Sequence, residues 1–366
     1  MENEPLVTIA IPNYNYAHYL ENCLNSLLNQ TYSNFEVYFR DNQSTDDSLK
    51  IALGYKDKFA ARGIYFNVSD NKRNLGSDIN SELARRDAEG EYIYTLASDD
   101  AVKPEFLEKT MKVFEDHPEV YTVITNREEI DENGKIYHTT PFYNRNCIID
   151  GESQAAVYMM AGIAIPAQRI TRTSNKLRQY VGRKWNVAGD WYINFLYSMV
   201  GNVAYIKESL VQYRVHTGNE TNESEKNLMG VFEHYQLINA FVDISKAFGM
   251  TKPAARYDEA VEKLGSMCLR YALKMLKLSL NDVACRYLQL APVFKKDIID
   301  DVIYIELSRI TKISGSELEY AINEFENIYN LNRTVSYDPP EGFKPLYLES
   351  VSYTHLRAHE TLSDLV

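Results

Sequence analysis

The chain has 366 residues, of which 45% are hydrophobic and 25% charged, with a formal net charge of −12. This length fits one large domain or two ordinary ones, and the acidic balance argues against nonspecific nucleic-acid binding. The sequence contains no run of about 18 apolar residues that would predict a membrane-spanning helix. Because no signal peptide is evident and the four cysteines lack metal or disulfide spacing, we expect a cytoplasmic protein. Contact with the inner face of the membrane would be peripheral at most.

Apolar runs typical of buried strands alternate with amphipathic helices over residues 6–125. Asn133-Gly134 lies between β-prone flanks and predicts a hairpin turn. The alternation predicts a doubly wound, mostly parallel α/β sheet of Rossmann-like type. The predicted strands are 6–11, 35–40, 64–68, 92–97 and 120–125.

Polar clusters follow the predicted strands of this sheet. Because the carboxyl ends of parallel strands share one edge, these clusters should surround a single crevice. Asp99 and Asp100 end a buried strand, where unpaired carboxylates are costly. These two carboxylates are expected either to bind a hard cation together with substrate phosphates, or to cap the N-terminus of the next helix. The clusters are 12–16, 41–46, 71–76 and 98–100.

The pattern changes after the hairpin. A helix predicted from Ala188 to Tyr197 carries Asp190 near its N-terminus, and short strands are predicted at 203–206 and 210–214. Successive amphipathic helices over 225–335 predict a separate all-helical C-terminal lobe.

The end of the chain is predicted to differ from the rest. Residues 336–350 are expected to form an extended tail. Residues 351–366 resemble translated sequencing-adapter sequence and are not expected to belong to the fold, so the natural C-terminus is expected to be missing.

A series of motifs in order resembles the family 2 glycosyltransferases of the GT-A fold, over roughly residues 6–218. The resemblance implies a donor half of about 1–126 and an acceptor half of about 127–218. The motifs are Ile9-Ala-Ile-Pro-Asn-Tyr-Asn15, Leu28-Asn-Gln-Thr-Tyr32, Phe35-Glu-Val37, Asp41-Asn-Gln-Ser-Thr-Asp46, Asn74-Leu-Gly76, Gly90-Glu-Tyr-Ile93, Ser98-Asp-Asp100, Gly189-Asp190 and Tyr213-Arg-Val-His216.

This resemblance implies an inverting, metal-dependent glycosyltransferase of hexosyltransferase type. It would move a sugar from a nucleotide-diphosphate sugar, most commonly a UDP-sugar in relatives, to a saccharide or lipid-linked saccharide hydroxyl. Mn²⁺ or Mg²⁺ is the implied cofactor, and bacterial cell-surface polysaccharide biosynthesis the implied role. The helical lobe would close over the acceptor, mediate homodimerisation or touch the membrane surface.

The family pattern assigns roles to particular positions. Asp100 would bind the metal directly, with His216 near the metal or the diphosphate. Asp190 matches the general base, although Gly189 replaces the acid that precedes it in many relatives. Ala97 likewise replaces a common acid. The positions assigned to the nucleotide sugar are Pro12, Tyr14, Asn15, Asp41, Asn42, Arg73, Asn74, Ser98 and Asp99.

Structural roles compete with several of these assignments. Asp190 could be a helix N-terminal acid favoured by the macrodipole, Asp41 a turn former and His216 an ordinary loop histidine. Trp191 is a candidate for contact with the acceptor or for bracing the base. Arg169 belongs to a basic cluster that either meets an anionic acceptor or forms a solvated helix face. The other members of this cluster are Arg172, Lys176 and Arg178.

Two other functions are alternatives to this one. A sugar-nucleotidyltransferase shares the α/β layout but needs a glycine-rich, basic loop after the first strand, and residues 12–16 contain neither glycine nor a basic residue. A non-catalytic nucleotide-sugar-binding relative would not need Asp190. Inverting transfer does need a base on the acceptor hydroxyl and a cation at the departing diphosphate, and the sequence offers separate acids for the two tasks.

Overall fold

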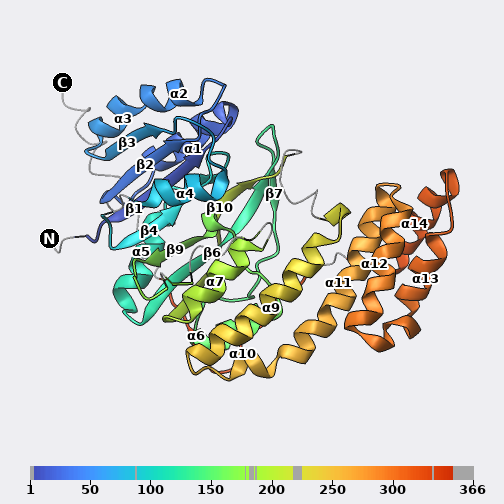
Figure 1. Ribbon diagram of the computed structural model, residues 1–366. Helices are drawn as coiled ribbons and strands as arrows, with labels where there is room; N and C mark the ends of the chain where they lie inside the picture. The colour runs from blue at the N-terminus through green and yellow to red at the C-terminus, as the bar shows by residue number, and fades with distance from the viewer. Residues whose placement is uncertain are drawn as a thin grey trace, which may run out of the picture.

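A mixed sheet and a helical lobe make up the computed structural model (Figure 1). The sheet domain occupies the blue-to-green part of the chain, and the helices from α9 onward extend away from it. The predictions for Arg178 and for residues 351–366 lie outside the described residues. The structure describes residues 4–86, 89–177, 179–180, 185, 188–216, 225–331 and 334–348.

The donor half forms a four-stranded parallel unit at one side of the sheet, in the order β4-β1-β2-β3. The pairing of β1 with β2 sets Asn13 opposite Asp41, so the polar segments after these strands begin side by side. This confirms the prediction that the polar clusters gather at one edge. The strands are β1 (Val7–Asn13), β2 (Phe35–Asp41), β3 (Tyr65–Asp70) and β4 (Tyr92–Thr95).

The acceptor half adds a strand that periodicity did not reveal. β9 (Arg169–Arg172) lies antiparallel between β4 and β6 (Val120–Ile130), so β4 and β6 are not neighbours. The two short strands predicted at 203–206 and 210–214 are one strand, β10 (Asn202–Arg214). β10 pairs with β6 in parallel, with a register shift between Ile206 and Ser209. A bulge of this kind bends a strand without ending it.

Short strands complete the sheet. The predicted hairpin is present, since β6 pairs with β7 and Gly134 takes a φ of 83° in the turn, a conformation that glycine adopts without steric cost. The short strands are β5 (Ala101–Val102), β7 (Ile136–His138), β8 (Cys147–Ile149) and β11 (Lys344–Pro345).

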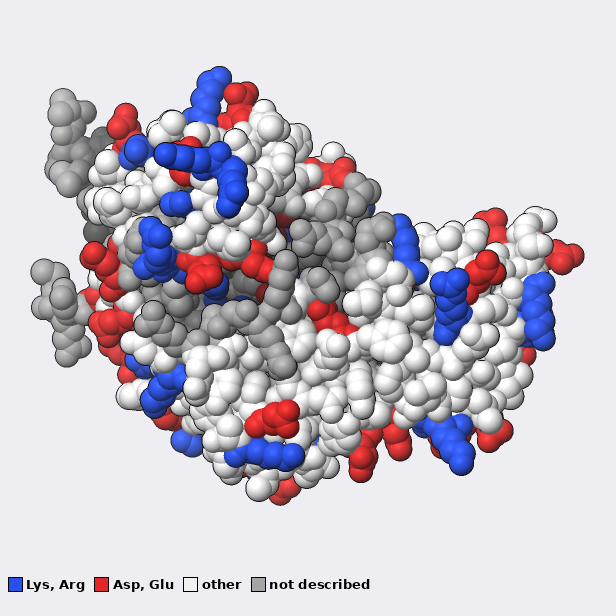
Figure 2. Space-filling model, viewed as in Figure 1, with Lys and Arg blue, Asp and Glu red and all other residues white. Residues whose placement is uncertain are grey.

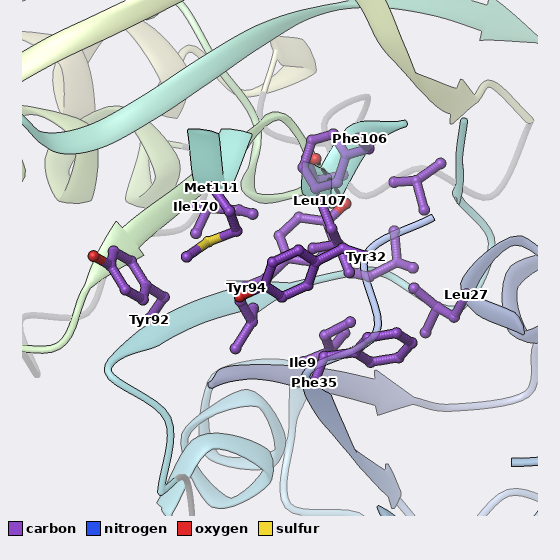
Figure 3. Packing of buried hydrophobic residues seen from close by; sticks show 14 of the residues in the cluster. Ile9, Leu27, Tyr32, Phe35, Tyr92, Tyr94, Phe106, Leu107, Met111 and Ile170 are labelled. Carbon is purple, nitrogen blue, oxygen red and sulfur yellow. Dashed lines mark hydrogen bonds between the residues drawn. The ribbon is translucent and has the colours of Figure 1, made fainter. Parts of the chain in front are cut away.

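Helices cover the sheet through apolar stripes, as the sequence predicts. α5 buries a row of side chains against β4, and Figure 3 shows Tyr94 of this strand among Phe106, Leu107 and Met111. The ring centroids of Tyr94 and Phe106 are 4.8 Å apart. The helices of this region are α1 (Ala17–Leu28), α2 (Ser48–Gly54), α3 (Lys56–Ala61), α4 (Ser77–Arg86) and α5 (Phe106–Asp116).

The helical lobe shares its hydrophobic core with two helices of the acceptor half, α6 (Gly151–Tyr158) and α7 (Gly189–Ser198). The lobe is therefore built directly onto the helix that carries Asp190. A short 3₁₀ helix at Pro166–Gln168 precedes β9, and another at Lys296–Asp300 lies within the lobe. The lobe helices are α9 (Met229–Ala247), α10 (Lys252–Ala255), α11 (Tyr257–Lys277), α12 (Asn281–Phe294), α13 (Val302–Ile310) and α14 (Ser316–Ile328).

The segment after α14 returns to the sheet. Tyr337 forms a β-bridge with Tyr143, β11 pairs with β8, and Leu346 is buried in the core of the sheet domain. The predicted extended tail is thus part of the sheet's edge. None of the helices that the structure describes has both the length and the apolar character to cross a membrane.

Candidate active site

The strand-end segments of β1 and β2 are joined by side-chain hydrogen bonds. Asp41 accepts from Asn13 Nδ2 at 2.8 Å, from Ser44 Oγ at 2.7 Å and from the Ser44 amide at 2.7 Å. Asn15 donates its amide to Ser44 Oγ at 2.9 Å and accepts the Thr45 amide at 2.8 Å. Asp41 is 2% exposed, so its carboxylate shapes the rim of the crevice from within.

A second network joins the segments after β2 and β3. Asn42 donates to Asn74 Oδ1 at 2.9 Å, and it accepts from Asn71 Nδ2 and from the Leu75 amide, each at 2.9 Å. Asn71 also donates to Asn80 on α4. The buried side-chain amide of Asn42 therefore makes its hydrogen bonds to other groups of the protein. Asn71 belongs to the polar cluster 71–76 that the sequence predicts, whereas Asn80, which lies within α4, was not singled out by sequence reasoning.

Other donor-side residues face solvent at the same edge. Tyr14 is 43% exposed and Arg73 is exposed, whereas Pro12 is half-buried. Asn13 Oδ1 and Ser98 Oγ are two of several buried side-chain atoms in the described part of the chain that have no hydrogen-bond partner. β1 and β4 pair in register up to Ala10 and Thr95, three residues before each of these side chains, so the two lie at equivalent strand ends. Buried polar atoms without partners point to a bound ligand or water.

Asp99 and His216 face each other, with Asp99 Oδ2 3.1 Å from His216 Nε2. Asp100 lies deeper, at 2% exposure, and its Oδ1 accepts the Arg214 amide at 2.9 Å. Burial raises the pKa of the Asp100 carboxyl well above its usual value, and the neighbouring Asp99 charge adds to this. The structure thus brings Asp99, rather than Asp100, against the histidine.

Aromatic and cationic side chains hold this corner together. The His216 ring lies 5.8 Å from the Tyr19 ring in a stacked arrangement and 5.6 Å from the Tyr16 ring. Arg214 lies 4.4 Å over the Tyr19 ring and donates to the Asp99 carbonyl at 2.9 Å. The ends of β4 and β10 and the start of α1 are therefore tied to each other. Tyr19 is a structural partner that the motif pattern did not include, and Arg214 lies within the Tyr213–His216 motif, which assigned it no role of its own.

Asp190 lies in the first turn of α7, across from α4. Solvent reaches its side chain, yet protein surrounds it closely enough for desolvation to raise the pKa of its carboxyl. The Arg169 and Arg85 charges oppose this rise, whereas Asp78 on α4 adds to it. A small cavity of about 10 Å³ is lined by Arg85 of α4, Tyr197 of α7 and residues of β4, β9 and the 3₁₀ helix before β9. Its lining residues are Arg85, Ile93, Thr95, Pro166, Arg169, Thr171 and Tyr197.

The prediction that Arg169 and Arg172 lie together on one solvated helix face is wrong, and contact of Arg169 with the acceptor stays a prediction. They lie on a strand at odd spacing, so their side chains point to opposite faces of the sheet. Arg169 is 6% exposed and donates to Asn194 on α7 at 2.9 Å. Arg172 donates to the Phe114 carbonyl at 3.1 Å on the α5 side. Each arginine anchors a different helix, and Lys176 alone of the described members is exposed.

Trp191 points into the helical lobe. Its indole N–H donates to the Tyr158 carbonyl at 2.7 Å, and its ring lies 5.1 Å from that of His234 on α9. The expectation that Trp191 contacts the acceptor or braces the base stays a prediction.

Comparison with known proteins adds to this geometry. Residues 8–183 match the family described as Glycosyl transferase family 2. An uncharacterized glycosyltransferase of Nostoc sp. is 27% identical over 250 residues, which cover 64% of this chain and 75% of that protein. Chondroitin synthase of Escherichia coli is 33% identical over 148 residues, 40% of this chain but 21% of the synthase. The crystal structure of S. aureus TarS 1-349 in complex with UDP-GlcNAc superimposes with a TM-score of 0.57 at 17% identity, covering 94% of this chain and 97% of that one.

This match over residues 8–183 confirms the resemblance to the family 2 glycosyltransferases that the sequence shows. The likeness to TarS confirms the predicted fold class, a GT-A-like mixed sheet, mostly parallel, followed by a helical C-terminal part.

Proposed function

We propose that this glycosyltransferase moves a sugar from a nucleotide-diphosphate sugar to a hydroxyl acceptor, with inversion and with the help of a divalent cation. The observation that carries the proposal is the Asp99–His216 pair at the strand-end edge that also presents Tyr14 and Arg73. TarS has been crystallised with UDP and with UDP-GlcNAc, which makes UDP-sugars the first donors to test. Relatives named chondroitin synthase and hyaluronan synthase support a saccharide acceptor and a role in polysaccharide synthesis.

The residues present fit a Mn²⁺ or Mg²⁺ site. Asp99 Oδ2 and His216 Nε2, which lie 3.1 Å apart at hydrogen-bond distance, would be two of the side-chain ligands of the ion. The described residues contain no group of three side chains that could hold a metal. The remaining ligands would come from the donor diphosphate and water, as is usual for Mg²⁺. A bound cation would neutralise charge on the departing diphosphate.

The donor residues divide into two groups by burial. Tyr14 and Arg73 reach solvent and are proposed to contact the nucleotide or diphosphate directly. Asp41 and Asn42 are buried and hydrogen-bonded, so we propose that they hold the strand-end loops in place. The role proposed for Pro12, Asn15 and Asn74 is to shape the same rim.

The buried atoms without partners complete the donor side. We propose that Asn13 Oδ1 and Ser98 Oγ take up hydrogen bonds when the donor is bound. Asn13 ends β1 and Ser98 follows the neighbouring parallel strand β4, and ligands of such sheets bind beyond the carboxyl ends of the strands.

Asp190 is proposed as the general base. As the acceptor oxygen forms its bond to the anomeric carbon, the bond from that carbon to the diphosphate oxygen breaks, and the nucleotide diphosphate leaves with the electron pair. The Asp190 carboxylate takes the proton of the acceptor hydroxyl. Arg169 and Arg85 favour the ionised form of this carboxyl, which the base requires.

The test is a calorimetric titration with UDP, GDP, dTDP and CMP, with and without Mn²⁺. It compares the wild type with Asp99→Ala, Asp100→Ala and His216→Ala, and uses Asp116→Ala on the exposed end of α5 as a control. Support requires one nucleotide that binds more tightly with Mn²⁺, an effect lost in Asp99→Ala and His216→Ala and kept in the control. If Asp100→Ala alone abolishes the Mn²⁺ effect, Asp100 is the metal ligand, and if no nucleotide binds, the donor-site proposal fails.

A further inference from the structure

The first turn of α7 lacks a capping side chain of its own. Its N-cap residue is Ala188 and the next is Gly189, neither of which offers an acceptor. In a capping box, a Glu or Gln three positions after the N-cap accepts the N-cap amide proton. That position is held here by Trp191, which points away into the lobe.

A glutamate from the helical lobe supplies the missing acceptor. Glu233 Oε2 on α9 accepts the Ala188 amide proton at 3.1 Å. Glu233 is 6% exposed, so this carboxylate lies inside the interface and not on a solvated face. An amide proton left unpaired at such a buried helix start would be costly. Glu233 therefore fixes the residue that stands two positions before Asp190.

The neighbouring contacts hold the rest of α7 to the same lobe helix. The Trp191 ring lies 5.1 Å from the ring of His234, the residue after Glu233. One helical turn further along α7, the Phe195 ring stacks on Phe241 of α9 at 3.8 Å between centroids. α7 is thus tied to α9 by one hydrogen bond at its start and by aromatic packing along its length.

We propose that Glu233 is a positioning residue, which caps α7 from the helical lobe and so holds Asp190 at the angle that catalysis needs. The helical lobe is then part of the catalytic apparatus. This inference rests on the proposed function, in which Asp190 is the base. Displacing a reacting group by about 1 Å can lower a rate about 100-fold, so a loosened first turn should reduce turnover much more than donor binding.

The test compares Glu233→Ala with Glu233→Gln, whose amide oxygen can still accept the Ala188 proton. Glu225→Ala is the matched control, because Glu225 is a buried lobe glutamate that pairs with Lys274 and not with α7. Amide hydrogen exchange over 188–198 needs no substrate. We expect faster exchange in Glu233→Ala and near wild-type exchange in Glu233→Gln and Glu225→Ala.

Turnover is then followed as UDP release from UDP-GlcNAc. For Glu233→Ala we expect a drop in kcat of at least about tenfold, with UDP affinity in the presence of Mn²⁺ within about twofold of the wild type, and recovery in Glu233→Gln. Unchanged exchange at α7, or a kcat loss that Glu225→Ala reproduces at equal Tm, overturns the inference. If the wild type binds no nucleotide, that result counts against the proposed function. The hydrogen-exchange result then tests by itself whether Glu233 caps α7.

Discussion

Different interactions hold the two sides of the proposed active site in place. The donor side consists of strand-end loops, joined by short polar contacts such as Asn13 to Asp41 and Asn42 to Asn74. The side with Asp190 is a helix held from behind by the apolar core that α7 shares with α9. The first arrangement can be recognised from motifs, because each loop directly follows its own strand. The second depends on packing partners far along the chain.

Surface charge does not distinguish the sheet domain from the helical lobe on the face that Figure 2 shows. On the face shown in Figure 2, basic and acidic side chains are interspersed over the helical lobe, and both signs occur around the sheet domain. The difference therefore lies in the hydrogen bonds and the buried contacts. Variants that disturb one side should leave the other intact, and each of the following predictions tests this separation.

The largest effect is expected from Asp190→Asn. Loss of a general base typically lowers the rate roughly 10²- to 10⁴-fold, whereas nucleotide binding depends on the other side of the crevice. We expect kcat to fall by that amount while calorimetric affinity for UDP with Mn²⁺ stays unchanged. Equal losses of binding and turnover would show that the two sides are not separable.

Phe241→Ala should damage the packed side by removing the ring stacked on Phe195. Phe241 is fully buried, and a Phe to Ala change in a core costs about 3–5 kcal/mol. Urea unfolding measures this loss. Phe232→Ala on the same helix is the control, since Phe232 is 45% exposed and should change stability by less than about 0.5 kcal/mol. Similar losses in both variants would refute the assignment of α9 as the support of α7.

Asp99→Ala should affect the polar side alone. Losing a residue that only orients a metal ligand costs about 10- to 100-fold in metal affinity, so loss of a direct ligand should cost at least that much. The measurement is the Mn²⁺ concentration that half-saturates the enhancement of UDP binding. The thermal stability without metal should remain close to that of the wild type, and a collapse of Tm would indicate a structural role instead.

The smallest effect concerns pH. Burial raises the pKa of Asp190 and the Arg169 charge opposes the rise, so Arg169→Met should raise this pKa further. Because the base acts only when ionised, the acidic limb of kcat against pH should move to higher pH. Arg169→Lys keeps a positive charge and should shift the limb less. A shift to lower pH, or the same shift in both variants, would contradict this electrostatic account.

Periodicity and strand-end polarity determined much of the donor half. The helix and strand pattern, the hairpin and the gathering of polar clusters at one edge were readable, because β-strand and helix periods are local and each loop follows its own strand. The same locality placed Asp190 in the first turn of a helix. The family motifs then assigned roles to particular positions, and these roles can be compared with the contacts of the same residues in the structure.

Tertiary structure decided what depends on contacts between distant segments. β9 enters the sheet between β4 and β6, which buries Arg169 and turns Arg172 to the opposite face. The end of β10 brings His216 to Asp99, although 117 residues separate them. The cap that Glu233 places on Ala188 joins residues 45 positions apart. None of these pairings leaves a periodic trace in the sequence, because each is selected by the packing of whole elements and not by the preferences of neighbouring residues.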